Sequence, residues 1–302
     1  MKRITIIFLL MFPAYMLFAQ DNFSDVESSG EMFMLVSSIM EAKAGYTHTF
    51  IMPFLQGDGP LTQGNNIKFN LSGEVTPISL NGIFSTVWTP IAFLELTAGT
   101  RFGTGWPINL FGGDIYGIGL NLPTGYDGSA FDSLMWKGYI GGTIQFDFAA
   151  IFPGDWNHVV FQSYHELNYH GSTRAQKGQA WFYESDDGEN MNGFNYYFSF
   201  LLGYQMPIFL NTIAFQAEGE LYLYDTPNRS IWGDDLIRWY FASAFIFDVT
   251  EKFSIAVIAQ FRTVRNFLTG TENLYYQDRI VDTNNPRRLE FFRFAAALTY
   301  RF

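Results

Sequence analysis

The stretch that decides the fold is FFRFAAALTYRF at 291–302. One set of alternate positions is apolar or aromatic: Phe292, Phe294, Ala296, Leu298, Tyr300 and Phe302. The other set is Arg293, Ala295, Ala297, Thr299 and Arg301. Charge is therefore confined to one side of the segment. A period of two is typical of a β-strand with one apolar and one polar face.

The same alternation recurs upstream. It is clear at 67–76, 93–102, 137–148, 213–223 and 253–262. Segments 157–170, 194–205 and 235–249 resemble strands but alternate less regularly. In the first of these, His165 falls on the apolar face, which requires either a bulge in the strand or a position above a membrane. Beyond the N-terminus no apolar run approaches the length of about 18 residues that a membrane helix needs, whereas a membrane strand needs only about 9–11 residues.

The N-terminus has the organisation of a secretory signal peptide. Lys2 and Arg3 precede an apolar run at 4–12 and the string PAYMLFAQ at 13–20. We expect residues 1–19 to be a signal peptide cleaved after Ala19. The alternative, a membrane anchor, needs a longer apolar run of about 20 residues.

The composition is rich in aromatic residues and poor in charge. Aromatic residues make up 19% of the 302 residues and charged residues 16%, against about 25% charged in a soluble domain. Loss of the two basic residues of the signal peptide changes the net charge from −11 to −13. This acidic balance argues against nucleic acid as a partner. The absence of cysteine removes disulfides and thiolate metal sites from consideration.

The end of the chain resembles the assembly signal of bacterial outer-membrane β-barrels. In that signal a terminal aromatic residue, here Phe302, follows Tyr300 two places earlier and alternating apolar residues such as Phe294 and Leu298. Together with the signal peptide, the resemblance implies an integral outer-membrane protein. Its implied partners are outer-membrane lipid and the barrel assembly machinery, which would contact the C-terminal strand. The alternative is a soluble periplasmic sandwich whose last strand is buried.

The expected fold class is an all-β, transmembrane, antiparallel up-and-down barrel that occupies 41–302. Ten strands are expected, near 41–54, 65–87, 92–103, 134–151, 157–170, 194–206, 211–224, 235–249, 251–267 and 288–302. Eight and twelve strands remain open, since 65–87 contains Pro77 and is either one bent strand or two strands with a turn at 76–78.

The connections alternate in length along the chain. Long polar connections lie at about 56–64, 104–133, 171–193, 225–234 and 268–288. In bacterial barrels the long loops are extracellular and the short turns periplasmic. We expect the long connections to be extracellular and both termini to be periplasmic.

The segment 20–40 precedes the first expected strand. It has apolar residues at helical spacing, namely Met32, Leu35, Val36, Ile39 and Met40. We expect a periplasmic lead-in to the barrel. A short helix that plugs the periplasmic mouth is the alternative.

The charged face of each strand should point into the lumen, because Arg or Lys in hydrocarbon costs about 2–4 kcal/mol. The lumen-lining candidates are Lys68, Glu74, Glu95, Arg101, Lys137, Asp147, Glu218, Glu220, Arg262, Arg293 and Arg301. They form either a salt-bridged polar core or a pathway whose ion preference they set. Tryptophans near strand ends are candidates for the membrane-boundary girdle: Trp88, Trp136, Trp156 and Trp239.

The sequence offers no catalytic residue, metal site or cofactor motif. The histidines of HELNYH at 165–170 are five apart, which places them on opposite faces of a strand. In size the chain is similar to omptin proteases, but their His/Asp pairing is not found here. The acidic patch Asp186, Asp187 and Glu189 is expected to be a solvated extracellular loop.

Two functions remain open. The first is a small channel or passive transporter for ions or small solutes. The second is a surface-interaction or adhesin-type barrel with a plugged lumen, whose binding loops carry aromatic residues. Those residues are Tyr126, Phe131, Trp181, Phe182, Tyr183, Trp232, Tyr275 and Tyr276.

Overall fold

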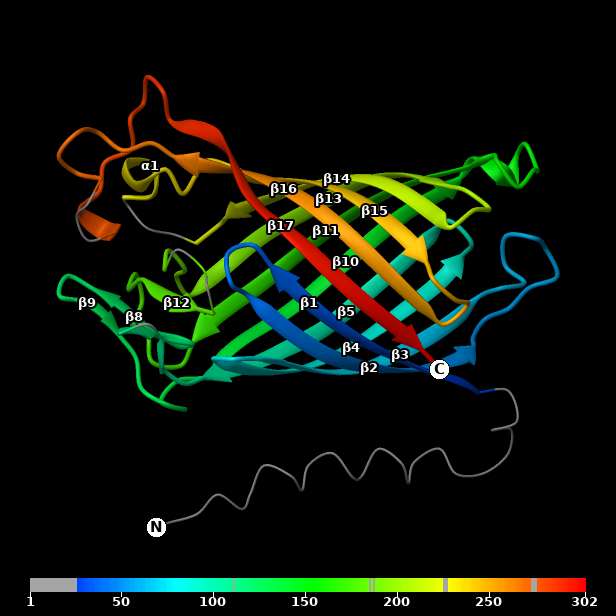
Figure 1. Ribbon diagram of the computed structural model, residues 1–302, viewed down its shortest axis with the longest axis horizontal. Helices are drawn as coiled ribbons and strands as arrows, with labels where there is room; N and C mark the ends of the chain where they lie inside the picture. Colours follow the sequence, from blue (N-terminus) through cyan, green and yellow to red (C-terminus); the bar gives the residue numbers. More distant parts are fainter. Residues whose placement is uncertain (1–25, 111, 185, 187, 225–227, 273–275) are drawn as a thin grey trace, which may run out of the picture.

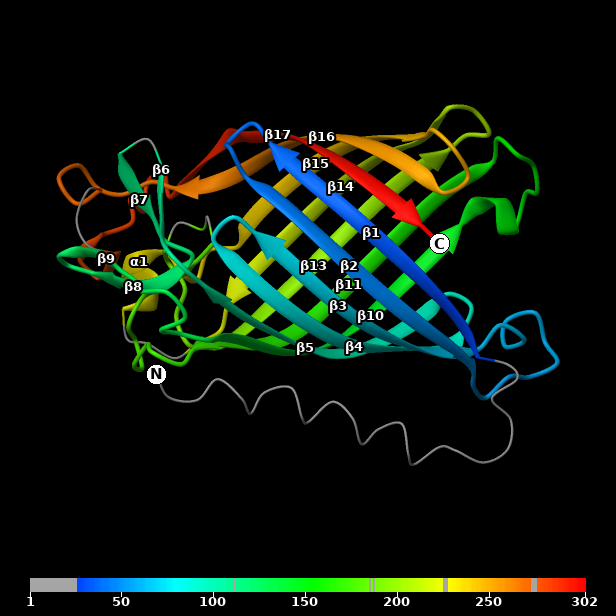
Figure 2. The same cartoon turned by 60° about the horizontal axis from the view of Figure 1, so that its bottom comes forward.

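Antiparallel strands close into a barrel (Figures 1 and 2). The computed structural model describes residues 26–302 except 111, 185, 187, 225–227 and 273–275. The signal peptide expected at 1–19 therefore lies outside the described residues. No helix in the described part is long and apolar enough to cross a membrane.

Twelve of the described strands form the barrel wall. They are β1 (Glu27–Ser37), β2 (Ala42–Pro53), β3 (Asn66–Thr76), β4 (Ser79–Ile91), β5 (Leu94–Gly105), β10 (Met135–Asp147), β11 (His158–Ser172), β13 (Gly193–Gln205), β14 (Leu210–Tyr222), β15 (Arg238–Asp248), β16 (Phe253–Arg265) and β17 (Arg287–Arg301). The loops contain β6 (Ile108–Leu110), β7 (Gly113–Ile115), β8 (Ile118–Leu122), β9 (Gly125–Asp127), β12 (Trp181–Tyr183), helix α1 (Arg229–Trp232) and the 3₁₀ turns η3 (Phe148–Ala150) and η4 (Tyr276–Asp278).

The barrel closes where β1 lies between β17 and β2. Met34 is opposite Leu298 of β17 on one side and Ala44 of β2 on the other. The backbones of Gly30 and Phe302 exchange two hydrogen bonds of 2.9 and 3.0 Å. Each edge of the sheet is thereby paired, as a strand surrounded by lipid requires.

The expectation of ten strands is wrong, and two local features account for the difference. The segment 20–40, expected as a periplasmic lead-in, contains β1. Its inward residues Phe33 and Leu35 are as apolar as its outward Met34, so the alternation is hidden and a helical spacing stands out instead. The segment 65–87 is two strands, and Pro77 lies in the turn between them, where no ladder hydrogen bond is lost.

The division of 65–87 into two strands reverses the direction of β2, so one loop changes sides. The connection 54–65, expected with the extracellular loops, lies at the barrel end that holds the C-terminus and the turns 92–93, 206–209 and 249–252 (Figure 1). The long connections 106–134, 173–192, 223–237 and 266–286 share the opposite end. We refer to these as the turn end and the loop end of the barrel.

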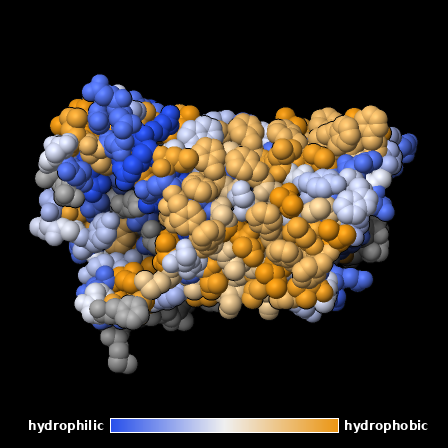
Figure 3. Space-filling view, turned by 45° about the horizontal axis from the view of Figure 1, so that its top comes forward, coloured by the Kyte–Doolittle hydropathy of each residue, from blue (hydrophilic) through white to orange (hydrophobic). Residues whose placement is uncertain are grey.

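The outer wall is apolar. Exposed large side chains cover it at mid-strand, as with Ile140 at 62% and Leu202 at 55% exposure. Apolar atoms dominate the wall in Figure 3, whereas hydrophilic ones gather over the loop end. Charged side chains of the strands point inward and form ion pairs with one another inside the barrel. An apolar exterior around a charged interior is the arrangement of transmembrane barrels.

The four candidate girdle tryptophans lie near strand ends. Trp88 and Trp156 are at the turn end, and Trp136 and Trp239 are at the loop end. Trp136 stacks on Tyr169 with ring centroids 4.9 Å apart. The four tryptophans thus lie at the two ends of the apolar outer wall. Their role as a membrane-boundary girdle stays a prediction.

His165 lies on the outer face without a bulge. The register of β11 with β10 and with β13 is continuous through it. Its ring bonds to Tyr196 Oη at 2.7 Å and to Ser163 Oγ at 3.0 Å. Its polar atoms are thus paired locally, while His170 turns to the opposite face and packs on Trp181.

Candidate functional site: the lumen and its loop constriction

Most of the predicted lumen residues pair with charges on other strands of the wall, either the adjacent strand or the next but one. Lys68 Nζ lies 3.0 Å from Glu95 Oε1, and Arg101 Nη2 lies 3.0 Å from Glu74 Oε2. Lys137 Nζ lies 2.7 Å from Glu166, a residue that the sequence analysis did not single out. Lys68 and Glu95 lie near the turn end of their strands, and Glu74, Arg101 and Lys137 lie near the loop end.

Further pairs continue the charged lining along the β14–β17 side. Arg262 Nε bonds to Glu290 at 3.0 Å, and Arg293 pairs with Glu41. On β14, Glu218 accepts a bond of 2.8 Å from Gln216, and the neighbouring carboxylate of Glu220 interacts with Arg238 and Lys137.

Two predicted lumen residues lie at the turn end instead. Asp147 is the last residue of β10 and pairs with His158 at 2.7 Å while capping η3. Arg301 pairs with Glu31 at 3.0 Å, and 62% of its side chain is exposed. Both therefore belong to the rim rather than to the interior of the barrel.

Loop 173–192 enters the loop end of the lumen. Its strand β12 pairs with β8, and β8 pairs with β9, which makes a small sheet inside the mouth. Ile118, Trp181 and Tyr183 of this sheet are buried together with Met135 of the barrel wall. The apolar triplet 181–183 in an otherwise polar loop was the sequence signal for this packing.

Glu184 fastens one end of this loop to the wall formed by β2–β5. Its carboxylate accepts bonds of 2.9 Å from Ser79 Oγ and from Asn81 Nδ2. Lys43 Nζ lies 3.3 Å away and Arg101 Nη2 3.7 Å away. The backbone of Glu184 has a φ of +56°, a conformation that non-glycine residues rarely adopt.

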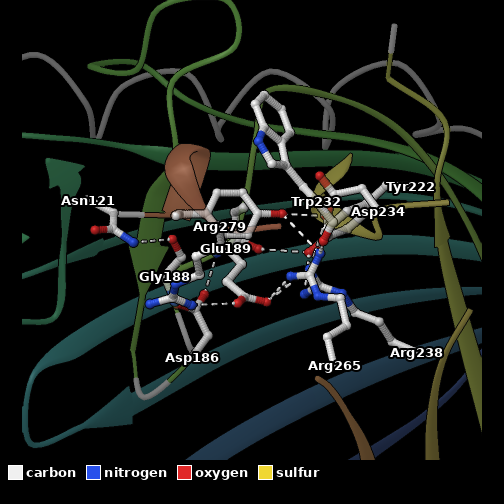
Figure 4. Close-up of polar contacts among 12 residues, drawn as sticks. Asn121, Asp186, Gly188, Glu189, Tyr222, Trp232, Asp234, Arg238, Arg265 and Arg279 are labelled. Carbon is white, nitrogen blue, oxygen red and sulfur yellow. Dashed lines mark hydrogen bonds and ion pairs between the residues drawn. The ribbon is translucent and has the colours of Figure 1, made fainter. Parts of the chain in front are cut away.

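Glu189 fastens the loop to the β15–β16 wall (Figure 4). Its carboxylate pairs with Arg265, with Arg238 at 3.2 Å and with Arg279 of loop 266–286 at 3.3 Å. Beside it, Asp234 is fully buried and accepts bonds from Arg265, Tyr224 and Tyr276. We call these three arginines and two carboxylates the arginine cluster.

The two attachment points face each other across the barrel. In the order β1-β17-β16-β15-β14-β13-β11-β10-β5-β4-β3-β2, strand β15 is fourth and β4 is tenth. Six steps around a ring of twelve strands is half of the circumference. Glu184 and Glu189 therefore attach the loop to opposite sides of the wall.

A cavity of about 320 Å³ remains between this loop and the β15–β16 wall. Four arginines and two carboxylates line it: Arg238, Arg262, Arg265, Arg279, Asp186 and Glu189. Its charge is thus an excess of two positive charges, although the whole chain is acidic. Tyr126, Tyr240 and Thr263 add hydroxyl groups to the lining.

The expectation of a solvated acidic loop is wrong for Glu189. Its side chain is 11% exposed and lies among arginines. Asp186 accepts bonds from the backbone N–H groups of Tyr183 and Gly188, so it holds the local turn. Asp187 lies outside the described residues. Sequence reasoning also missed Lys43, Glu184, Arg238 and Arg265, because their partners come from segments far apart in the chain.

The surroundings of the two anchoring carboxylates favour their ionised forms. Burial alone would raise the pKa of Glu184, but Lys43, the bond from Asn81 and Arg101 together hold it below its usual range. Burial likewise opposes ionisation of Glu189, yet Arg265 and Arg238 lower its pKa. Both loop anchors are therefore charged at neutral pH.

Among the described residues, no group of three or more His, Asp or Glu side chains is placed to hold a metal ion. The polar groups that line the cavity are those of its arginines, carboxylates and hydroxyl-bearing residues.

Comparison with known proteins gives matches to solved structures at low sequence identity. No protein-family model matches the chain, and no curated protein matches it. Among solved structures, it is similar to the KdgM porin (8% identity, TM-score 0.38) and the NanC porin (7%, 0.39), over 91% of this chain and 99% of each of those. It is also similar to the β-domain of the Bordetella autotransporter BrkA (9%, 0.41), over 91% of this chain and 98% of that one. These are barrel proteins of the bacterial outer membrane.

Proposed function

We propose that this protein is an integral outer-membrane channel that lets ions or small solutes pass passively, and that loop 173–192 narrows its lumen. The observation that carries the proposal is the charged cavity of about 320 Å³ between that loop and the β15–β16 wall. The interior of a barrel of about eight strands is filled by side chains, and aqueous channels appear at 16–18 strands. Twelve strands leave space that a loop can narrow.

The outside of the barrel supports the proposed outer-membrane location. Exposed aliphatic and aromatic side chains cover its wall, while charged side chains of the strands face the lumen. The short connections 92–93, 206–209 and 249–252 at the turn end match periplasmic turns, and the four long connections at the loop end match extracellular loops. In this orientation the constriction lies near the cell surface.

The C-terminal strand is proposed to be what the barrel assembly machinery recognises. Phe294, Leu298 and Tyr300 are exposed on the outer face of β17, at 57%, 38% and 45%. Phe302 stacks on Tyr46 of β2 with ring centroids 5.9 Å apart. Replacement of Phe302 by Ala should slow assembly in cells and leave refolding in detergent nearly unchanged; equal effects on both would argue against recognition.

The second candidate function is a surface-interaction barrel with a plugged lumen. The observation in its favour is the ordered packing of the loops, in which Tyr222, Tyr224, Trp232 and Tyr276 form a second buried aromatic cluster with Ala180 and Met191. A barrel of this kind would use the outer surface of its loops and would conduct nothing.

The deciding experiment is single-channel conductance of residues 20–302, refolded and inserted into a planar bilayer. A channel should give discrete steps, and replacement of Arg262 or Arg293 by Gln should shift its ion preference, because each removes a positive charge from the lumen. A correctly folded barrel that gives no steps would overturn the proposal and leave the surface-interaction function.

A further inference from the structure

We propose that Arg238, Arg265 and Arg279 form a binding site for the carboxylate or phosphate group of a small anionic solute, and that Glu189 of the constriction loop occupies this site in its absence. The inference deepens the proposed function, on which it rests for the route by which the solute arrives. It names the class of solute and the contact that the solute displaces.

Glu189 acts as an internal ligand of the arginine cluster. Three guanidinium groups from two barrel strands and a second loop converge on its one carboxylate. A guanidinium group presents a planar set of donors that matches a carboxylate or a phosphate. A cluster that holds one carboxylate in this way can hold another of the same shape.

The two carboxylates of the cluster differ in how firmly they are fixed. Asp234 is fully buried and accepts bonds from Tyr224 and Tyr276 as well as from Arg265. The carboxylate of Glu189 contacts the three arginines, and its side chain is 11% exposed whereas that of Asp234 is 0% exposed. Glu189 is thus the exchangeable anion and Asp234 the permanent one.

One nitrogen of the arginine cluster carries hydrogen-bond donors that Glu189 does not use. Nη2 of Arg238 lies 3.2 Å from Glu189 and 3.6 Å from Asp234, yet it is buried without hydrogen-bond geometry to any acceptor in the described part of the chain. A buried unsatisfied donor is unfavourable. A phosphate offers more acceptor oxygens than a carboxylate and can satisfy this donor.

The cavity beside the cluster has room for the rest of a small solute. Its volume of about 320 Å³ is at the lower end of the range for ligand pockets, about 300–1,000 Å³. Arg262 lies on its lumen side, held over the ring of Phe292 at 4.4 Å. A solute that binds the cluster would therefore extend toward the lumen, where Tyr240 and Thr263 offer hydroxyl groups.

Direct binding tests the site independently of conduction. The refolded full-length barrel, in detergent free of lipopolysaccharide, is titrated with inorganic phosphate by calorimetry, against chloride at equal ionic strength. Phosphate should bind the wild type, and Glu189→Gln should bind it about tenfold more tightly or better, because the tethered competitor loses its charge. Arg279→Gln should weaken binding by about tenfold or more, since it removes one of the three guanidinium groups.

Glu31→Gln is the matched control, because it too removes a glutamate from an arginine pair, but at the turn end of the barrel. It should bind phosphate as the wild type does. Equal binding by the wild type, Glu189→Gln and Arg279→Gln, or no binding by any of them, would overturn the site. Binding of lipopolysaccharide without binding of free phosphate would also overturn the proposal, because the ligand would then be a lipid phosphate and not a small solute.

The two proposals fail differently. Conductance steps without phosphate binding would leave the channel and remove the anion site. Binding of phosphate by a barrel that gives no conductance would leave the site and remove the channel. Block of the conductance by phosphate, tighter in Glu189→Gln, would support both.

Discussion

Phe198 lies across Gly219 on the outer face of the barrel, and the missing side chain of the glycine makes that possible. The two residues are paired between β13 and β14. A Cβ atom on Gly219 would lie 2.3 Å from the ring of Phe198, which is also held by Trp239 at 5.2 Å between ring centroids. The aromatic ring covers the backbone that the glycine leaves open.

Gly219→Val should therefore destabilise the barrel. The added side chain displaces Phe198 from its neighbours, and overpacking of this kind typically lowers the free energy of unfolding by about 1–3 kcal/mol. Gly73→Val is the control, because a Cβ at that position has no atom within 4 Å. It should change the free energy by less than about 0.5 kcal/mol. Denaturant unfolding in detergent measures both, and equal losses would contradict the role given to Phe198.

The charged residues of strands could be assigned to the lumen from the sequence, but the charged residues of loops could not be assigned to any partner. Lys68 and Glu95 were predictable as lumen residues, because a strict period of two leaves a charged side chain only one inward face. Glu189 could not be placed, since a loop has no period and its partners Arg238 and Arg265 follow tens of residues later.

The elements that sequence failed to predict are those that complete the barrel and fill it. The apolar inner residues Phe33 and Leu35 hid β1, since they face the lumen where a polar residue was expected. Phe33 is accommodated there because Gly45 leaves space beneath its ring. Most of the other strands were placed correctly, since one face of each is polar.

Strand β1 should be indispensable for closure. A chain that starts at residue 27 should refold in detergent to a compact, heat-modifiable form, because every strand keeps two neighbours. A chain that starts at residue 38 leaves β2 and β17 with unpaired edges, each backbone group of which costs several kcal/mol in lipid. Electrophoretic mobility without heating distinguishes the two. Normal folding of the shorter chain would restore the view that this segment only leads into the barrel.

The constriction loop 173–192 should be released by acid. Glu184 and Glu189 have pKa values below the usual glutamate range, so their ion pairs stabilise the folded loop above that range and are lost as the pH falls through the lowered values. Hydrogen exchange of the loop should thus stay slow from neutral pH down to about pH 5 and accelerate below about pH 4, after correction for the intrinsic rate.

Glu184→Gln tests the cause of that acid release. The amide keeps the shape of the side chain but loses the attraction of Lys43 and Arg101. Exchange in the loop should already be faster at neutral pH, and the remaining acid dependence should be smaller. Protection that is the same in the variant and the wild type at every pH would show that the packing of Trp181 and Tyr183, rather than the ion pairs, holds the loop.

For the whole molecule, the decisive property is which face of the wall meets lipid. Val257 and Ile258 are neighbours on β16, and both are aliphatic. Val257 is 45% exposed on the outer face, opposite Phe245 and Ala296. Ile258 faces the lumen and is opposite the small residues Ala244 and Ala295. Substitutions at these two positions therefore compare the outer and inner faces of the wall at one depth in the membrane.

Val257→Arg should lower the free energy of unfolding in lipid vesicles by about 2–4 kcal/mol, because the guanidinium group is forced into hydrocarbon. Ile258→Arg should lower it less, because its guanidinium group can extend past small side chains into a lumen that already holds Gln260 and Arg262 on the same face. A soluble barrel with water outside would give the opposite order, since an exposed Val257→Arg would then be nearly neutral. The order of the two losses, measured by denaturant unfolding, therefore tests the membrane orientation of the entire wall without any assumption about what passes through it.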